Sequence, residues 1–290
     1  MLKTGVLGLG AMGTPMAMNL HRAGHLFAVY NRTPGKAEAL AAATGAIVAA
    51  SPADLAAHCP LIVTSVSKDE DLQEVIQALV PGFKPGTVVV DTSTVNADTA
   101  KAMAAYLKER GSRFLDCPVS GGVEGAKHGT LAMMVGGDPE TLAQVRPTLA
   151  CLAKNIIHMG PSGSGQATKA VNQVMAAGIN QAVTEALAFA QALGLDVDKV
   201  IDVVGGGAAA NWFLSHRGKT MIAGHYPPGF KLALHLKDLL ICQAMAEDLD
   251  GCELPLANMT SEHYRQLIQS GFGDEDISVL YHLKKPLITL

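Results

Sequence analysis

The chain has 290 residues, of which 49% are hydrophobic and 17% are charged, and its formal net charge is -4. This balance excludes a strongly basic nucleic-acid-binding surface and a disordered acidic tail, and it favours a small-molecule partner. No apolar run approaches the roughly 18 residues that cross a bilayer, so we expect no membrane partner. The length suits two domains, since a domain commonly has about 100 to 200 residues.

The cysteines and the N-terminus bear on the compartment. Five cysteines, an odd number without C-x-x-C spacing, argue against a disulfide framework and against a zinc site, so we expect no metal. The first residues lead directly into an apolar strand and lack the charged start and cleavage site of a signal peptide. These features predict a cytoplasmic protein.

Short β-branched runs alternate with helical stretches over the first half of the chain. This alternation predicts an α/β domain over residues 1–161 with a largely parallel, doubly wound sheet. Ser51 and Pro52 are typical of a helix start, with a capping hydroxyl before a proline at the first helical position. The predicted strands are GVLGL, FAVY, LIVTSV, TVVVD, RFLDCPV, LAMMVGG and NIIHM.

Strand signals cease after Gly165, and the rest of the chain reads as helical. From Gln166 to Leu193 apolar and small residues recur at helical spacing, which predicts a helix of roughly 40 Å that joins the two domains. Its alanine-rich surface suits close packing against other helices, including those of a second subunit. We therefore expect an all-α domain over residues 162–290 that serves substrate binding and oligomerisation.

A glycine-rich motif follows the first predicted strand and opens the first predicted helix. Gly8 permits a tight turn, Gly10 lets the backbone approach a pyrophosphate, and Gly13 brings the helix against the strand. A plain glycine-rich turn is the alternative, which the flanking strand and helix disfavour. The motif predicts a Rossmann-type dinucleotide site that consists of Gly8, Leu9, Gly10, Ala11, Met12 and Gly13.

The end of the second strand predicts which dinucleotide is bound. An NAD enzyme usually carries an acid there, which bonds the adenosine ribose and would repel a 2′-phosphate. This chain has Asn31, Arg32 and Thr33 instead. A guanidinium that can grip phosphate, flanked by neutral side chains, favours NADP, with NAD still possible. The alternative is that Arg32 only stacks on the adenine.

Two further segments hold candidate chemical residues. Ser120, Gly121 and Gly122 offer a hydroxyl and two open backbone N–H groups that suit a substrate carboxylate, although a simple turn would look the same. Lys169, Asn172 and Gln173 are three and four positions apart on one face of the long helix. A lysine there can donate or accept the proton of a carbonyl–alcohol pair, whereas on composition alone a solvent-facing lysine is the commoner interpretation.

Four motifs in order resemble the β-hydroxyacid dehydrogenases. They are GLGAMG-x-P-M-A-x-N-L from Gly8, D-x-P-V-S-G-G from Asp116, G-x-x-x-K-x-x-N from Gly165, and Lys237-Asp238-Leu239. That family includes 3-hydroxyisobutyrate dehydrogenase, tartronate semialdehyde reductase and the glyoxylate and succinic semialdehyde reductases, and it is related to 6-phosphogluconate dehydrogenase. The resemblance covers nearly the whole chain.

The resemblance implies a role for each matching residue. Lys169 falls on the catalytic lysine, Ser120 to Gly122 on the carboxylate loop, and Asn172 on a residue beside the substrate. Thr94 falls on a threonine near the nicotinamide ribose and Lys237 on a lysine that reaches the cofactor, while Phe230 and Asp238 match residues that close the pocket. Where many members carry Leu-Pro, this chain has Val66-Ser67, so the backbone near the nicotinamide is expected to differ.

Together these features predict an NADP-preferring oxidoreductase. It would transfer hydride between nicotinamide and a small carboxylate bearing a semialdehyde, 2-oxo or 3-hydroxy group, or glyoxylate, with Lys169 as general acid and base. The alternatives are an NAD-dependent 3-hydroxyisobutyrate dehydrogenase and a non-catalytic NADP-binding sensor or scaffold; Lys169 disfavours an imine reductase. A homodimer or homotetramer is expected, and the sequence leaves open the substrate, the direction and the role of the terminal KKPLITL.

Overall fold

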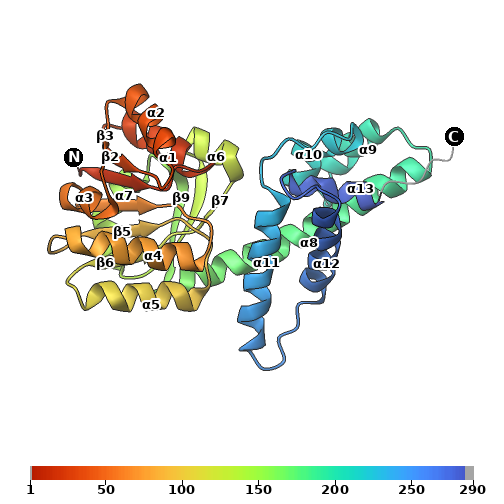
Figure 1. The fold of residues 1–290 in the computed structure, drawn as a ribbon. Coiled ribbons are helices and arrows are strands. Elements are labelled where there is room, and N and C mark those ends of the chain that lie inside the picture. The colour runs from red at the N-terminus through yellow and green to blue at the C-terminus, as the bar shows by residue number, and fades with distance from the viewer. Residues whose placement is uncertain (1, 285–290) are drawn as a thin grey trace. The chain divides into compact units, whose positions relative to one another are not determined.

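The computed structural model describes residues 2–284, so all of the KKPLITL segment except Lys284 lies outside the described residues. The chain folds as two compact units, residues 1–169 and 170–290 (Figure 1). Each has its own apolar core and is described by itself. The predicted division at residues 161 and 162 stays a prediction.

Unit 1 is built on one nine-stranded sheet in the order β3-β2-β1-β4-β5-β6-β8-β7, with β9 paired to β8. The pairs from β3 through β6 are parallel, as is the pair of β8 with β9, whereas β8 runs antiparallel to β6 and β7. The strands are β1 (Thr4–Leu7), β2 (Leu26–Tyr30), β3 (Ile47–Val48), β4 (Leu61–Thr64), β5 (Val88–Asp91), β6 (Arg113–Asp116), β7 (Val119–Ser120), β8 (Leu131–Gly136) and β9 (Ala153–Gly160).

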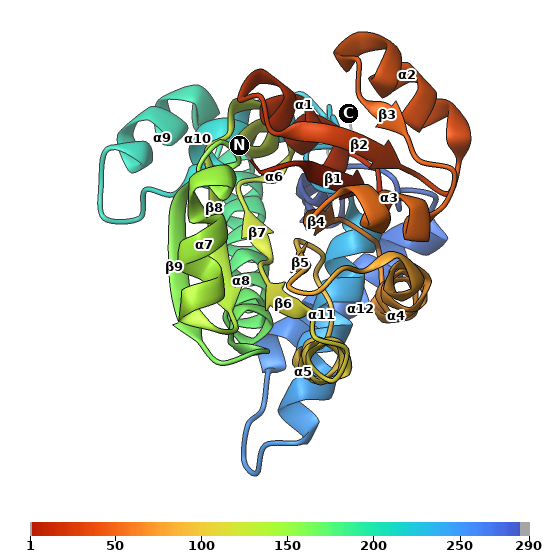
Figure 2. The same ribbon diagram turned by 90° about the vertical axis from the view of Figure 1, so that its left-hand side faces the viewer.

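Helices cover both faces of this sheet because its central strands are apolar on both sides. In β4, Leu61 and Val63 face one core while Ile62 faces the other. The first core holds α1 (Gly13–Arg22), α2 (Pro34–Thr44), α6 (Gly122–His128) and α7 (Pro139–Leu149). The second holds α3 (Pro52–His58), α4 (Asp69–Leu79) and α5 (Ala97–Lys108), which line one face of the sheet in Figure 2. A 3-10 turn, η1 (Val80–Gly82), follows α4.

Local signals position these helices as predicted. Ser51 caps α3 by accepting a hydrogen bond from the Asp54 backbone N–H at 3.1 Å, and Pro52 occupies the first helical position. Pro34 likewise occupies the first helical position of α2. The long helix predicted from Gln166 to Leu193 is α8 (Ser164–Ala192), which begins in unit 1 and continues in unit 2.

The described part of unit 2 is helical, as predicted. Around α8 it has two adjoining cores, one of which contains the buried Tyr264 and the other Tyr281. Its further elements are α9 (Val197–Gly205), α10 (Trp212–Ile222), α11 (Leu232–Glu247), α12 (Pro255–Gln269), η2 (Ile277–Leu280) and α13 (Tyr281–Lys284). The predicted α/β domain followed by an all-α domain, joined by a long helix, is confirmed.

Candidate active site

The glycine-rich loop connects β1 to α1 at the carboxyl end of the sheet. Gly8 has φ +92°, and a Cβ there would overlap the carbonyl oxygen of Ser65. A Cβ on Gly13 would overlap the carbonyl oxygen of Gly8, so only glycine lets α1 approach this closely. Gly10 has open space beside it. The close approach of strand and helix that this glycine spacing predicts is therefore present, and the contact of the loop with a pyrophosphate stays a prediction.

Asn31 braces this loop from the end of β2. Its Oδ1 accepts a hydrogen bond from the Leu9 backbone N–H at 2.8 Å, and its Nδ2 donates to the Thr33 carbonyl at 2.9 Å. Asn31 thus fixes the turn through Leu9, a role that the sequence did not reveal. Whether Asn31 and Thr33 also contact a cofactor stays a prediction.

Arg32 lies on the surface beside the loop. Its side chain is 85% exposed, and its guanidinium is 3.4 Å from Asp71 Oδ1. An exposed pair at this separation is worth at most about 1 kcal/mol, so Arg32 can leave Asp71 for a stronger anion at little cost.

A cavity of about 720 Å³ opens at the glycine-rich loop. Gly10 and Ala11 line it, together with residues of α1, α2 and α6. Lys36, in the first turn of α2, adds a cation to this lining. Lys36 is not among the residues predicted from the sequence, although its position four residues after Arg32 is a signal that could have indicated it.

The segments after β4 and β5 are held together by a buried carboxylate. Asp91 accepts hydrogen bonds from the hydroxyls of Thr64 at 2.8 Å and Ser93 at 2.6 Å, and Ser93 Oγ accepts from the Val66 N–H at 2.9 Å. Among the described residues, the second oxygen of Asp91 is buried with no hydrogen-bond partner. Burial raises the pKa of Asp91 to about 6, against the opposing effect of the two hydroxyls. The predicted nicotinamide residues Val66, Ser67 and Thr94 lie in these two segments.

Lys169 and the Ser120–Gly122 loop come together in unit 1. The Lys169 side chain is buried, with 7% of the residue exposed, and its Nζ donates to the Val119 carbonyl at 2.9 Å. The amine therefore lies at the residue before Ser120, and the solvent-facing interpretation of this lysine is wrong. Gly121 and Gly122 have φ of +126° and +60°, which turns the chain from β7 directly into α6.

Asp116 anchors the start of α8 to the same strand segment. Its two carboxylate oxygens accept from the backbone N–H groups of Gly163 at 2.8 Å and Gln166 at 3.0 Å. Burial raises the pKa of Asp116, and these backbone hydrogen bonds oppose that rise. The motif residue Asp116 thus has a structural task that the sequence analysis did not assign.

The predicted site residues of unit 2 form a second group. Asn172 donates to Gln173 Oε1 at 2.7 Å, and Gln173 Nε2 donates to Asp238 Oδ2 at 2.6 Å. The other oxygen of Asp238 is 2.8 Å from the Lys237 ammonium. Gln173 and Asp238 are buried, and the Lys237 side chain is 27% exposed. A continuous polar chain therefore joins four of the five predicted residues of this unit.

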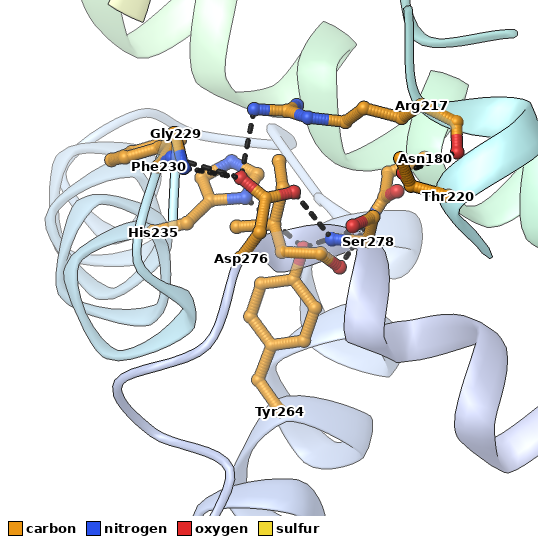
Figure 3. A network of polar contacts seen from close by, with 10 residues as sticks. Asn180, Arg217, Thr220, Gly229, Phe230, His235, Tyr264, Asp276 and Ser278 are labelled. Atoms are coloured by element: carbon orange, nitrogen blue, oxygen red, sulfur yellow. Dashed lines mark hydrogen bonds and ion pairs between the residues drawn. The ribbon is translucent and has the colours of Figure 1, made fainter. Parts of the chain in front are cut away.

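Phe230, the fifth, is fixed by a buried ion pair (Figure 3). Asp276 Oδ2 is 2.9 Å from the Arg217 guanidinium and accepts the backbone N–H groups of Gly229 and Phe230. The Phe230 ring lies 5.1 Å from the ring of His235, in a tilted arrangement. Sequence reasoning missed this network because its hydrogen bonds join residues more than 40 positions apart.

His235 and Tyr264 connect this network to α8. Asn180 Nδ2 donates to the Tyr264 hydroxyl at 3.1 Å, and the hydroxyl is 3.1 Å from His235 Nδ1 (Figure 3). His235 Nε2 is 3.3 Å from the carbonyl oxygen of Gln173, the residue that bonds Asp238. Burial raises the pKa of Tyr264, so this hydroxyl stays protonated.

Comparison with known proteins gives the site its family. The model for the NAD-binding domain of 6-phosphogluconate dehydrogenase matches residues 3–160, and that described as NAD-binding of NADP-dependent 3-hydroxyisobutyrate dehydrogenase matches residues 163–284. The 2-hydroxy-3-oxopropionate reductase of Escherichia coli is 36% identical over 96% of each chain. The chain belongs to the β-hydroxyacid dehydrogenase family.

Two further relatives show the range of the family. The NAD-dependent L-serine dehydrogenase of Pseudomonas aeruginosa is 32% identical over 97% of each chain. A structure of the Mycobacterium tuberculosis 3-hydroxyisobutyrate dehydrogenase with L-serine is 33% identical, with a TM-score of 0.88 over 99% of this chain and 100% of that one. This chain is therefore an NAD(P)-dependent hydroxyacid dehydrogenase that acts on CH–OH groups, and the non-catalytic alternative is set aside.

No helix between residues 2 and 284 has the length and apolar character that a membrane crossing needs. Over the same range, no group of three or more His, Cys, Asp or Glu side chains could hold a metal ion.

Proposed function

We propose that this dehydrogenase prefers NADP and transfers hydride between nicotinamide and a small 3-hydroxy acid, semialdehyde or glyoxylate, with Lys169 as general acid and base. One observation carries the proposal. The Lys169 amine is buried and donates to the carbonyl of Val119, immediately before the Ser120–Gly122 loop. A proton donor thus lies beside a loop whose hydroxyl and backbone N–H groups suit a carboxylate.

Reduced nicotinamide supplies the hydride for the substrate carbon. The Lys169 ammonium donates a proton to the carbonyl oxygen as the hydride arrives, and the neutral amine accepts the alcohol proton in the reverse direction. Ser120, Gly121 and Gly122 hold the carboxylate at a fixed distance from that carbonyl. Asn172, Gln173, Phe230 and Asp238 are proposed to contact the substrate, and Thr94, Val66, Ser67 and Lys237 the cofactor.

Removal of the amine tests this role. Lys169→Ala is expected to lower kcat by about 10² to 10⁴, the usual contribution of a positioned acid–base group, while the protein still binds NADPH. Lys101→Ala is the matched control, because Lys101 is exposed and forms a surface ion pair with the exposed Asp98. Turnover of Lys169→Ala at the control rate with the best aldehyde acid would show that another group moves the proton.

The NADP preference rests on two cations and on the absence of an acid after β2. Arg32 is exposed and weakly paired, and Lys36 lines the cavity at Gly10 and Ala11. Both are available to a 2′-phosphate, for which a guanidinium is the stronger ligand. Initial rates with NADPH and NADH, for the wild type and Arg32→Ala, test the preference. Equal use of both cofactors by the wild type would favour the NAD-dependent alternative, which the L-serine relative exemplifies.

The substrate is proposed to be a carboxylic acid with its reacting carbon at the 3-position or, for glyoxylate, at the 2-position. The relatives named for 2-hydroxy-3-oxopropionate, 3-hydroxyisobutyrate and L-serine support a three-carbon carboxylate frame. The rate at which reduced-nicotinamide absorbance is lost, measured with each of several semialdehydes and with glyoxylate, ranks these candidate substrates. We propose a cytoplasmic location, which the five free cysteines support.

A second copy of the chain is the proposed protein partner. One face of α8 carries Val171, Met175 and Phe189 at helical spacing, and Leu193 follows directly after the helix; each is at least 56% exposed. A stripe of this kind is typical of a helix that packs on another helix, which supports a homodimer or homotetramer. Light scattering of the wild type and of Phe189→Glu tests this. A monomeric wild type at micromolar concentration would contradict it.

A further inference from the structure

Gln166 forms a two-point contact with the segment after β5. It lies in the first turn of α8 and is 1% exposed. Its Nε2 donates to the Ser93 carbonyl at 2.8 Å, and its Oε1 accepts from the Val95 N–H at 3.2 Å. The orientation of the amide follows from these partners, because a carbonyl only accepts and an N–H only donates. One side chain thus holds the backbone on both sides of Thr94.

The same contact reaches the segment after β4. Ser93 donates its hydroxyl proton to Asp91 and accepts from the Val66 N–H with the same oxygen. Gln166 therefore holds a residue that in turn holds Val66. Both segments that are proposed to meet the nicotinamide depend on this one buried hydrogen-bond network.

The backbone of Gln166 fixes the helix that carries the amine. Its N–H donates to Asp116 Oδ2, and Lys169 follows one helical turn later. Gly165 lies so close to the sheet that a Cβ there would be 2.5 Å from the carbonyl oxygens of Asp116 and Met134. The first turn of α8 is therefore held in one position against the strands. The Gln166 side chain connects this turn to Ser93 and Val95.

We propose that Gln166 is a positioning residue that sets the nicotinamide segment, Ser93 to Val95, against the Lys169 amine. The inference rests on the proposed roles of Thr94 and Lys169. A glutamine suits the task because its amide offers a donor and an acceptor side by side to two backbone groups two residues apart, and it does so at every pH. An apolar side chain of the same size would leave both buried groups unpaired and the segment free to shift.

A binding experiment separates positioning from general stability. Gln166→Met is expected to weaken NADPH binding about tenfold, because the two hydrogen bonds that hold the Ser93 and Val95 backbone are lost. It should leave the affinity for adenosine 2′,5′-bisphosphate, which lacks the nicotinamide half, unchanged. Gln181→Met is the control, because Gln181 is also a buried amide on α8 but bonds Thr260 and His263 in unit 2. Equal loss for both ligands, or no loss for NADPH, would overturn the proposal.

A second variant supplies a pH signature. In Gln166→Glu the ionised carboxylate cannot donate to the Ser93 carbonyl, whereas the protonated acid reproduces the donor and acceptor of the amide. The NADPH affinity of Gln166→Glu, divided by that of the wild type at each pH, should therefore rise as the pH falls from about 8 to about 5.5. A pH-independent ratio would overturn the proposal. This comparison also carries the test if Gln166→Met does not fold.

The two proposals fail in different ways. If Lys169→Ala turned over normally, the general acid would be lost, but the selective effect of Gln166→Met on NADPH would still stand. If Gln166→Met bound both ligands as the wild type does, the positioning role would be lost and the assignment of Lys169 would be unaffected. Because the binding measurements need no substrate, their outcome does not depend on which hydroxy acid the enzyme uses.

Discussion

Asp91 is a fully buried carboxyl group that accepts hydrogen bonds from two hydroxyls. Its pKa is about 6 because burial penalises the charged form more than the hydroxyls of Thr64 and Ser93 stabilise it. Asp116, itself buried, adds repulsion between like charges. Compared with the unfolded chain, the fold therefore favours the protonated acid, and ionisation of Asp91 lowers the free energy of unfolding.

This gives a prediction for stability against pH. A group whose pKa is raised on folding, here from 3.8 to about 6, stabilises the fold fully below pH 3.8, and its contribution is lost as the pH rises through about 6. The loss is on the order of 3 kcal/mol for two pKa units. The difference in free energy of unfolding between wild type and Asp91→Asn should thus fall between pH 4 and 7. A difference that does not change with pH would contradict the raised pKa.

Arg217 and Asp276, by contrast, form a buried ion pair in which each charge compensates the other. Their side chains are 12% and 2% exposed. Arg217→Met would leave the Asp276 carboxylate buried beside backbone N–H groups alone, so we expect a loss of about 3 to 5 kcal/mol in free energy of unfolding. Urea unfolding followed by fluorescence of Trp212, the one tryptophan of the chain, reports on unit 2 directly.

The control for that variant is an exposed pair in the same unit. Lys199 and Asp196 are 3.2 Å apart, with side chains 84% and 51% exposed. Lys199→Ala should cost less than about 1 kcal/mol, because water screens the pair. A loss in Arg217→Met no larger than in Lys199→Ala would mean that the carboxylate of Asp276 becomes hydrated or protonated once its partner is removed.

At the scale of elements, the packing of α8 against the sheet depends on the absence of a side chain at Gly165. Gly165→Ala would place a Cβ against two strand carbonyls that cannot move without breaking the sheet, and we expect a cost of about 1 to 3 kcal/mol. Gly205→Ala, at the end of α9 where a Cβ meets open space, should be neutral or stabilising. Thermal unfolding of both variants checks this. Equal melting temperatures would show that α8 shifts freely on its strands.

The elements also show what a sequence can predict. Long periodic segments were placed well: the helix expected from Gln166 to Leu193 is Ser164–Ala192. The strand β3 was not predicted because two residues are too few to show periodicity, and the predicted strand RFLDCPV joined β6 to the first residue of the separate strand β7. The antiparallel pairing of β7 with β8 was also not foreseen, since alternation along the chain does not encode the direction of an edge strand.

For the site, the sequence predicts local motifs but not the contacts between residues far apart in the chain. The glycine-rich loop follows from spacing because a turn, a strand and a helix are adjacent in sequence. The contacts of Gln166 with Ser93, or of Asp276 with Phe230, join residues 73 and 46 positions apart, and no local pattern marks them. Buried polar side chains whose partners are backbone groups are therefore the part of this site that only the fold reveals.

At the scale of the whole molecule, cofactor binding adds to the stability of the fold by mass action. A ligand at about 100 times its Kd raises the free energy of unfolding by roughly 2.7 kcal/mol, or about 5 to 10 °C in Tm for a chain of this size. At one common concentration, NADPH should therefore raise Tm more than NADH. Arg32→Ala should remove most of this difference, whereas Lys108→Ala, an exposed cation on α5, should keep it. Equal increases of Tm with both cofactors in the wild type would mean that Arg32 stays paired with Asp71 and does not bind the 2′-phosphate.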